Sequence, residues 1–227
     1  MTLDFWLEQK LPYAWSYYPR NRTELYCGTD QICNIDPNWT FPVTYIMNSH
    51  GFRTHEFEDI KNEQINISLG CSHTMGIGLP IEMTWPSLIE KQTKIKTLNL
   101  GLGGASTDTV ARFLTNISGL FDVNSVYILW PPFNRFEEYH NDRIVEILPH
   151  CAKLEHAWYM DESNSYQRFY KNQKIVDILK KLHNFDLHQL QYDTTDWHVP
   201  GDLARDQIHS GPKSHLNLAN MFLTMNE

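Results

Sequence analysis

The chain has 227 residues, of which 41% are hydrophobic and 20% are charged, and its formal net charge is −8 at pH 7. This composition excludes a disordered chain and a coiled coil, and the length is sufficient for one well-packed domain. The acidic balance argues against nucleic-acid binding, which requires clustered Lys and Arg on the surface.

Membrane, export and metal-binding signals are the next features to consider. No run approaches the roughly 18 consecutive apolar residues of a membrane span, and Met1–Lys10 has neither the basic nor the apolar region of a signal peptide. We therefore expect a cytoplasmic protein with reduced cysteines, although Cys27 and Cys33 are close enough to bridge under oxidising conditions. Metal-binding Cys/His spacings are absent, so we expect no metal site.

The first part of the chain is rich in aromatic residues and interrupted by prolines. We predict that residues 1–60 form an irregular extension packed on a single domain, which spans residues 1–227. Within the extension, Thr40–Met47 is predicted to be a short strand. Asn48–Gly51 is predicted to be a turn, because Asn and Gly tolerate positive φ.

Strands and helices alternate in the rest of the chain. The predicted strands are Gln64–Leu69, Lys94–Leu100, Val123–Trp130 and Phe185–Gln191. The predicted helices are Trp85–Lys91, a helix capped by Ser106 or Thr107 and running to about Leu120, a mostly helical stretch over Asp142–Leu182, and Pro212–Met225. This order is typical of βαβ units, so we predict a single α/β domain with a parallel sheet.

A serine directly follows the first predicted strand. Ser72 lies in the turn Gly70–Gly76, where its hydroxyl would be exposed on a rigid element and main-chain N–H groups could stabilise an oxyanion. Taken alone, this pattern favours a serine that only caps the next segment.

An acid and a base lie three positions apart near the end of the chain, at Asp206 and His209. At this spacing the carboxylate can hold the imidazole Nδ1–H and leave Nε2 free to take a proton. Asp202 is a rival for the acid, but the three-residue spacing favours Asp206. Taken alone, the pattern favours a surface turn.

Glycines follow the second predicted strand, at Gly101, Gly103 and Gly104. One interpretation is a dinucleotide fingerprint ending at Ser106, with Asp122 further along, which would indicate a nucleotide-binding oxidoreductase. The other is an oxyanion loop in which the Gly104 N–H is a donor.

Taken together and in this order, the three patterns resemble the SGNH (GDSL-type) hydrolase family. The first block resembles Ile67–Gly76, the second Asn99–Thr107, and the last Asp206–His209 followed by His215. The resemblance covers roughly residues 43–223. It implies the SGNH hydrolase fold, which is a three-layer, flavodoxin-like α/β/α domain with a parallel sheet of about five strands.

The resemblance also implies residue roles. Ser72 would be the nucleophile, His209 the base and Asp206 the residue that orients it. The N–H groups of Ser72 and Gly104 would bind the oxyanion. His215 is expected to make a helix-start hydrogen bond rather than to take part in the chemistry.

This chain departs from the family pattern in two blocks. Cys71 replaces an aspartate of the first block, where we expect it to be a packed small residue. The third block should contain Gly-x-Asn but is Leu129–Arg135 here, so Asn134 is the only nearby candidate for the third oxyanion donor, about one residue late. Arg135 is either a ligand for a substrate carboxylate or a solvated or salt-bridged side chain. His73 and Trp130 are further candidates for lining the substrate pocket.

The expected function is a serine esterase that hydrolyses acyl or O-acetyl esters and needs no cofactor. Its expected partner is a small-molecule or carbohydrate ester substrate. Two alternatives stay open besides the oxidoreductase: an acyl or acetyl transferase acting on a carbohydrate, and a catalytically degenerate SGNH-like module that binds a glycan or a protein. Neither the acyl-chain preference nor the oligomeric state follows from the sequence.

Overall fold

The computed structural model describes residues 35–225, apart from residues 141–142, 150–151 and 194. The first 34 residues of the predicted extension lie outside this range, and so does the predicted pair Cys27 and Cys33. The remaining residues of the extension, 35–60, are irregular except for the short helix α3 (Phe57–Ile60).

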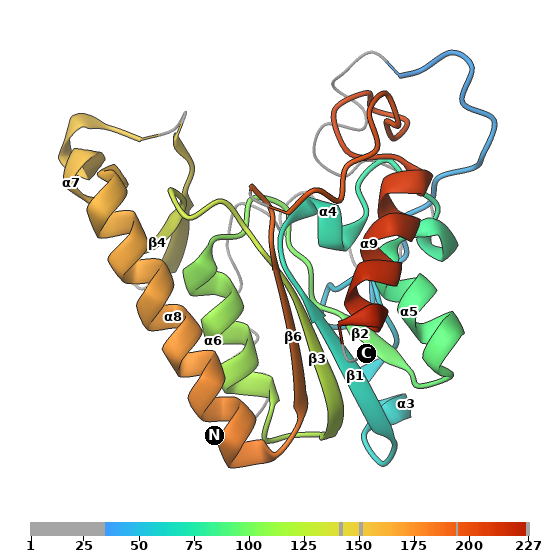
Figure 1. Ribbon diagram of the computed structural model, residues 1–227, viewed down its shortest axis with the longest axis horizontal. Coiled ribbons are helices and arrows are strands. Elements are labelled where there is room, and N and C mark those ends of the chain that lie inside the picture. The colour runs from blue at the N-terminus through green and yellow to red at the C-terminus, as the bar shows by residue number, and fades with distance from the viewer. Residues whose placement is uncertain (1–34, 141–142, 150–151, 194, 226–227) are drawn as a thin grey trace.

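Four predicted strands form one parallel sheet (Figure 1). They are β1 (Gln64–Leu69), β2 (Thr97–Asn99), β3 (Asp122–Trp130) and β6 (Asp186–Gln191), in the spatial order β2-β1-β3-β6. The predicted α/β class with a parallel sheet is confirmed, and in the described part of the chain the sheet has four strands where about five were expected. Strand order reverses beside β1, and ligands of open α/β sheets bind at the carboxyl ends of the strands at such a point.

Strand β3 shows why these residues form a sheet buried on both faces. Val126, Ile128 and Trp130 belong to one hydrophobic cluster, whereas Tyr127 and Leu129 belong to another on the opposite face. Successive side chains of a strand point to opposite faces, so a continuous apolar run supplies both halves of the core.

Helices cover both faces of the sheet, with α5 and α9 on one side and α6 and α8 on the other (Figure 1). Their bounds are α5 (Trp85–Thr93), α6 (Thr107–Ile117), α8 (Glu162–His183) and α9 (Pro212–Thr224). Helix α6 begins as predicted, because the Ser106 side chain accepts the Thr109 N–H at 3.3 Å and satisfies one of the free donors of its first turn.

Several short elements complete the described structure. They are α4 (Ser72–Met75), α7 (Ala157–Met160) and the 3-10 turns η2 (Ile81–Met83) and η4 (Leu154–His156). Among the helices of residues 35–225, none combines the length and the apolar character that crossing a membrane requires.

The strand predicted over Thr40–Met47 does not form. Val43, Tyr45 and Met47 are buried, and the two positions between them are exposed. The segment instead packs on Met75 through its side chains, and the Thr44 carbonyl accepts from the Arg53 guanidinium at 2.6 Å rather than from a neighbouring strand. The adjoining turn is confirmed, since the Gly51 N–H donates to the Asn48 carbonyl at 2.8 Å.

The predicted helical stretch over Asp142–Leu182 is also wrong in its first half. An antiparallel hairpin of β4 (Phe136–His140) and β5 (Arg143–Ile147) precedes the helices, and the long helix α8 starts only at Glu162. The hairpin is held by distant partners: Arg112 of α6 donates two hydrogen bonds to Glu137 of β4, at 2.6 and 2.9 Å. The sequence pattern within the hairpin does not indicate contacts with residues so far away in the chain.

Candidate active site

Ser72 is the first residue of α4 and follows the carboxyl end of β1 after a tight turn. The turn requires Gly70, because a Cβ there would overlap Thr74 Oγ1 and lie 2.7 Å from the Leu129 carbonyl oxygen. The main-chain N–H of Ser72 is in the first turn of the helix, where no intrahelical acceptor exists. Ser72 therefore occupies a rigid position with a donor that a ligand can use.

The glycine loop after β2 is fastened to the Ser72 turn. The Asn99 side chain donates to the Thr74 carbonyl at 2.8 Å, and the Leu102 N–H donates to the Gly70 carbonyl at 3.1 Å. A Cβ on Gly101 would overlap the Met75 nitrogen and lie 2.7 Å from the Thr74 carbonyl carbon. The first and second blocks of the sequence thus form one interlocked unit.

Gly104 lies further along the same loop with φ of 84°, a conformation that favours glycine. Among the described residues, the only side chain within 4 Å of a Cβ placed there is that of Leu148, whose methyl groups lie 3.8 Å away. The Gly104 position is therefore open on the side where the hairpin ends.

Asp206 and His209 form a close pair in the loop before α9. Asp206 Oδ2 lies 2.6 Å from His209 Nδ1, and Asp206 Oδ1 accepts the N–H groups of His209 and Ile208 at 3.0 and 3.1 Å. Asp206 is fully buried, so its carboxylate needs these donors. With Nδ1–H donating to the carboxylate, Nε2 of His209 is the ring nitrogen that can take a proton.

Asp202, the rival for the acid, has another partner. Its Oδ2 accepts the Ser214 N–H at 2.7 Å, in the first turn of α9. A carboxylate at the start of a helix satisfies a free donor and interacts favourably with the helix dipole. The structure pairs His209 with Asp206 and leaves Asp202 as a cap.

The segment after α4 is docked on the Asp206 loop. The Arg205 N–H donates to the Gly78 carbonyl at 3.1 Å, and a Cβ on Gly78 would lie 2.8 Å from Ala204 Cβ and 3.3 Å from Asp206 Oδ1. On the other side, the rings of His73 and His209 have centroids 4.9 Å apart. These contacts bring the residue next to Ser72 against His209. No hydrogen bond joins Ser72 Oγ to another described residue.

His73 lies in a cluster of rings that the sequence patterns did not reveal. Besides His209, its neighbours are Tyr192, Trp197 and His198, with centroids 5.0, 5.4 and 5.9 Å away. Burial, followed by the positive charge that His209 can carry, holds the pKa of His73 well below its ordinary value. His73 is therefore neutral, and its Nδ1 has no hydrogen-bond partner within the described residues.

His215 makes the helix-start hydrogen bond that we expected. Its Nδ1 accepts the N–H of Trp85, the first residue of α5, at 3.1 Å. Complete burial lowers the pKa of His215 to about 3, so it stays neutral and ties α9 to α5. This role is structural.

The third block differs from expectation at Trp130. Its side chain is 1% exposed, packs edge-to-face on Phe169 and donates to Gln189 Oε1 at 2.8 Å. Trp130 therefore belongs to the core and does not line a substrate pocket, because the last residue of β3 still points into the layer between sheet and helices. Cys71 is likewise 1% exposed in the same core cluster, as a packed small residue would be.

Asn134 and Arg135 lie in the turn after β3. The Arg135 N–H donates to the Pro132 carbonyl at 3.3 Å and closes this turn. The Asn134 side chain is partly buried and makes no hydrogen bond with another described residue. Arg135 Nη1 donates to the carbonyl of Ala105, the residue after Gly104, at 3.4 Å.

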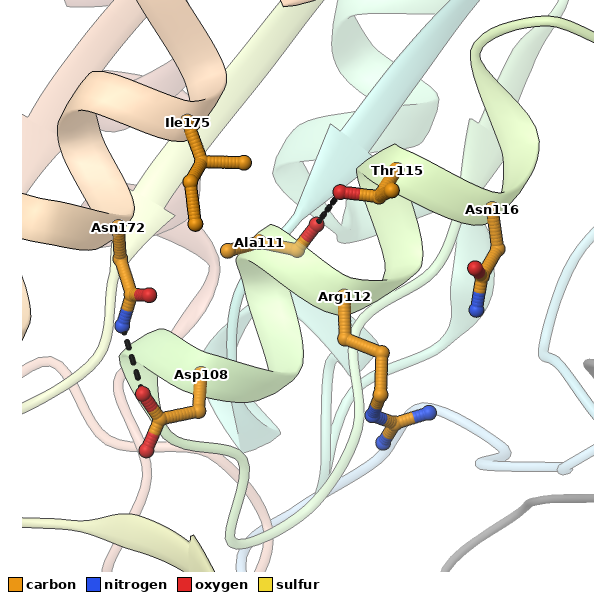
Figure 2. A pocket seen from close by; sticks show the side chains of 7 residues that line it. All are labelled: Asp108, Ala111, Arg112, Thr115, Asn116, Asn172 and Ile175. Atoms are coloured by element: carbon orange, nitrogen blue, oxygen red, sulfur yellow. Dashed lines mark hydrogen bonds between the residues drawn. The ribbon is translucent and has the colours of Figure 1, made fainter.

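A pocket of about 230 Å³ lies elsewhere, between α6 and α8 (Figure 2). Its lining residues are Asp108, Ala111, Arg112, Thr115, Asn116, Asn172 and Ile175. The Asn172 amide donates to Asp108 across its edge at 2.8 Å. None of the predicted site residues lines this pocket. Among the residues that the structure describes, no group of three His, Cys, Asp or Glu side chains is arranged to hold a metal ion.

Comparison with known proteins gives matches only among solved structures. A scan against models of protein families finds no match, and a search of the curated proteins finds none either. A lipolytic protein of the G-D-S-L family from Veillonella parvula is 12% identical with a TM-score of 0.38, and the match covers 72% of this chain and 98% of that one.

Two esterases are similar to the same extent. A psychrotrophic esterase from Pseudoalteromonas is 13% identical with a TM-score of 0.40, and the match covers 72% of this chain and 97% of that one. A carbohydrate acetylesterase from Sinorhizobium meliloti is 11% identical with a TM-score of 0.37, with 70% and 96% covered.

Proposed function

We propose that this protein is a serine hydrolase of carboxylic esters, with Ser72, His209 and Asp206 as its catalytic residues. The observation that carries the proposal is the buried carboxylate of Asp206, 2.6 Å from His209 Nδ1, in a loop docked on the segment that follows Ser72. A carboxylate and an imidazole so arranged beside a serine at a strand end are the parts that acyl transfer requires.

The reaction follows from the positions of these groups. Ser72 Oγ attacks the ester carbonyl while His209 Nε2 takes the hydroxyl proton, and Asp206 stabilises the imidazolium that forms. The N–H groups of Ser72 and Gly104 donate to the oxyanion, and Asn134 is the candidate third donor. The C–O bond to the alcohol then breaks as His209 returns the proton to the leaving oxygen. Water, activated by His209, releases the acid and restores Ser72.

The hydroxyl of Ser72 must approach His209 when substrate is bound, since no hydrogen bond links them in the described structure. Catalytic hydrogen bonds are often long without a ligand and tighten in the complex. The ring contact of His73 with His209 fixes one side of the imidazole while this happens.

A panel of p-nitrophenyl esters from acetate to longer acyl chains tests the proposal, on wild type and on Ser72→Ala in parallel. We expect wild type to hydrolyse one or more of these esters and Ser72→Ala to lose this activity with an unchanged thermal unfolding temperature. The acyl-chain length that wild type prefers indicates the size of its acyl pocket. Wild-type rates in Ser72→Ala would rule out the assignment. Ser163→Ala, an exposed serine on α8, is the matched control and should keep full activity.

The same panel separates hydrolysis from acyl transfer. With an acceptor sugar present, a hydrolase releases free acid, whereas a transferase gives an O-acylated sugar. We expect free acid as the main product. A folded wild type that turns over no ester and transfers no acyl group would instead favour a binding module.

A further inference from the structure

Arg135 is placed beside the proposed oxyanion loop. It follows the turn after β3, and its Nη1 donates to the Ala105 carbonyl at 3.4 Å, one residue beyond Gly104. The guanidinium charge also acts on the ionisation of His73, Tyr192 and Asp193, which lie after β1 and β6. The cation therefore faces the proposed site from the side of the third strand.

Arg135 also has no carboxylate partner among the residues that the structure describes. Among residues 35–225 as described, no Asp or Glu oxygen lies within 4.0 Å of its guanidinium. Two other arginines of the same region are paired: Arg112 lies 2.6 Å from Glu137, and Arg168 lies 3.6 Å from Asp108. A partly buried guanidinium with one long hydrogen bond keeps most of its donors for a ligand.

The chemistry of the group indicates what that ligand is. A guanidinium presents a planar fork of N–H donors that matches a carboxylate, and such charge-assisted pairs are stronger than neutral hydrogen bonds. Asp193 at the end of β6 is the acidic neighbour, but it is exposed and lies beyond ion-pair distance. A carboxylate on the substrate has the pair of acceptor oxygens that this guanidinium fork matches.

We propose that Arg135 binds a carboxylate of the substrate, so that the preferred substrates are esters carrying a negative charge near the scissile bond. This inference rests on the proposed esterase function and adds the substrate class to it. Arg135 is then a specificity residue, whose contribution is made in binding and depends on the charge of the substrate.

Two acetyl esters of nearly equal shape test the proposal: 4-acetoxybenzoate, which is anionic, and 4-acetoxybenzamide, which is neutral. We expect wild type to prefer the anion in kcat/KM by about tenfold or more, mainly through KM. Arg135→Gln should lose this preference, because its rate on the anionic ester should fall about tenfold further than its rate on the neutral one. Arg135→Lys, which keeps the charge without the fork, should retain part of the preference.

Lys213→Gln removes an exposed cation at the start of α9 and controls for the general field of the protein. It should leave the preference intact. Equal rates of wild type on the two esters would overturn the proposal, as would an equal loss on both esters in Arg135→Gln, which is the result expected of an oxyanion donor.

A binding measurement separates this proposal from the esterase function. 4-Acetamidobenzoate and 4-acetamidobenzamide are amides of the same shape, and calorimetry measures their binding without ester turnover. We expect wild type to bind the carboxylate about tenfold more tightly than its neutral analogue. Arg135→Gln should bind the two compounds equally. Carboxylate preference without ester turnover would refute the esterase alone, whereas turnover without carboxylate preference would refute the role of Arg135 alone.

Discussion

Replacing Asp206 by Asn changes one atom of the Asp206–His209 pair and isolates what the carboxylate does. Asp206 Oδ1 accepts two main-chain N–H groups, at 3.0 and 3.1 Å, and the amide oxygen of Asn can continue to do so. The loop should therefore keep its shape. On the other side, the Asn NH₂ group would meet His209 Nδ1 in place of the oxygen now 2.6 Å away.

The expected effect on the rate is large because the imidazole must change tautomer. Facing a donor, Nδ1 becomes an acceptor and the proton moves to Nε2, which then cannot take the Ser72 proton. In a triad of this kind the substitution lowers kcat on the order of 10⁴, or about 5.5 kcal/mol of transition-state stabilisation. Stability should fall by only about 1–2 kcal/mol, as charge-assisted hydrogen bonds become neutral ones.

The assay compares Asp206→Asn with Asp202→Asn, four residues earlier in the same loop. Asp202 accepts the Ser214 N–H in the first turn of α9, and the amide oxygen of Asn can accept it in the same way, so this control should keep its activity with little change in stability. Turnover of an acetyl ester and thermal unfolding are measured on both variants. The reasoning is refuted if Asp206→Asn stays within about tenfold of wild type, or if Asp202→Asn is the inactive variant.

Three further changes test the surroundings of the site. Gly101→Ala places a Cβ 2.7 Å from the Thr74 carbonyl carbon, so we expect a loss of about 2 kcal/mol in the free energy of unfolding and a Tm lower by about 4–8 °C. In the control Gly119→Ala, the Cβ meets, among the described residues, only a His183 side-chain atom at 3.3 Å, so the Tm should fall much less. Equal melting temperatures of the two variants would contradict the overlap. Burial raises the pKa of Glu146 well above its ordinary value, so the folded state holds a proton that the unfolded state loses. The stability of the wild type therefore falls as the pH rises from the unfolded pKa through the folded one. Glu146→Gln should raise Tm at about pH 8 and change it little near pH 4, and a difference that does not depend on pH would contradict the buried, protonated Glu146. Burial lowers the pKa of His215 to about 3, so its contribution to stability is complete above the unfolded pKa of 6.5 and is lost as the pH falls towards 3. In His215→Asn, the free energy of urea unfolding should fall less steeply with acidification than in wild type. The same dependence on pH in both proteins would contradict a buried neutral imidazole.

The elements predicted correctly are those whose signals are local. Strand β1 is a β-branched run that stops at Gly70, β3 is an apolar run that stops at Pro131, and α6 begins at the cap Ser106. The hairpin of β4 and β5 was missed because Arg112, far from it in the sequence, holds Glu137. Local patterns carry no information about such partners.

The candidate site likewise combines short-range features, which the sequence predicts, with long-range contacts, which it does not. The pair of Asp206 and His209 is a short-range pattern, and the structure brings the two side chains together as their spacing suggested. The surroundings of His73 come from Tyr192 and Trp197, more than a hundred positions away, and no motif announces them. Trp130 was predicted to line the substrate pocket, but an aromatic residue at a strand end can either face a pocket or pack in the core. The sheet determines which face the side chain occupies, and here it is buried in the core.

Labelling with a fluorophosphonate tests the central claim most directly, because it needs no knowledge of the substrate. The reagent phosphonylates a serine only where a base activates the hydroxyl and an oxyanion hole accepts the phosphoryl oxygen. We predict one adduct, on the peptide that contains Ser72, which disappears in Ser72→Ala and forms far more slowly in Asp206→Asn. An adduct on a different serine, or no adduct on the folded wild-type protein, would contradict the account.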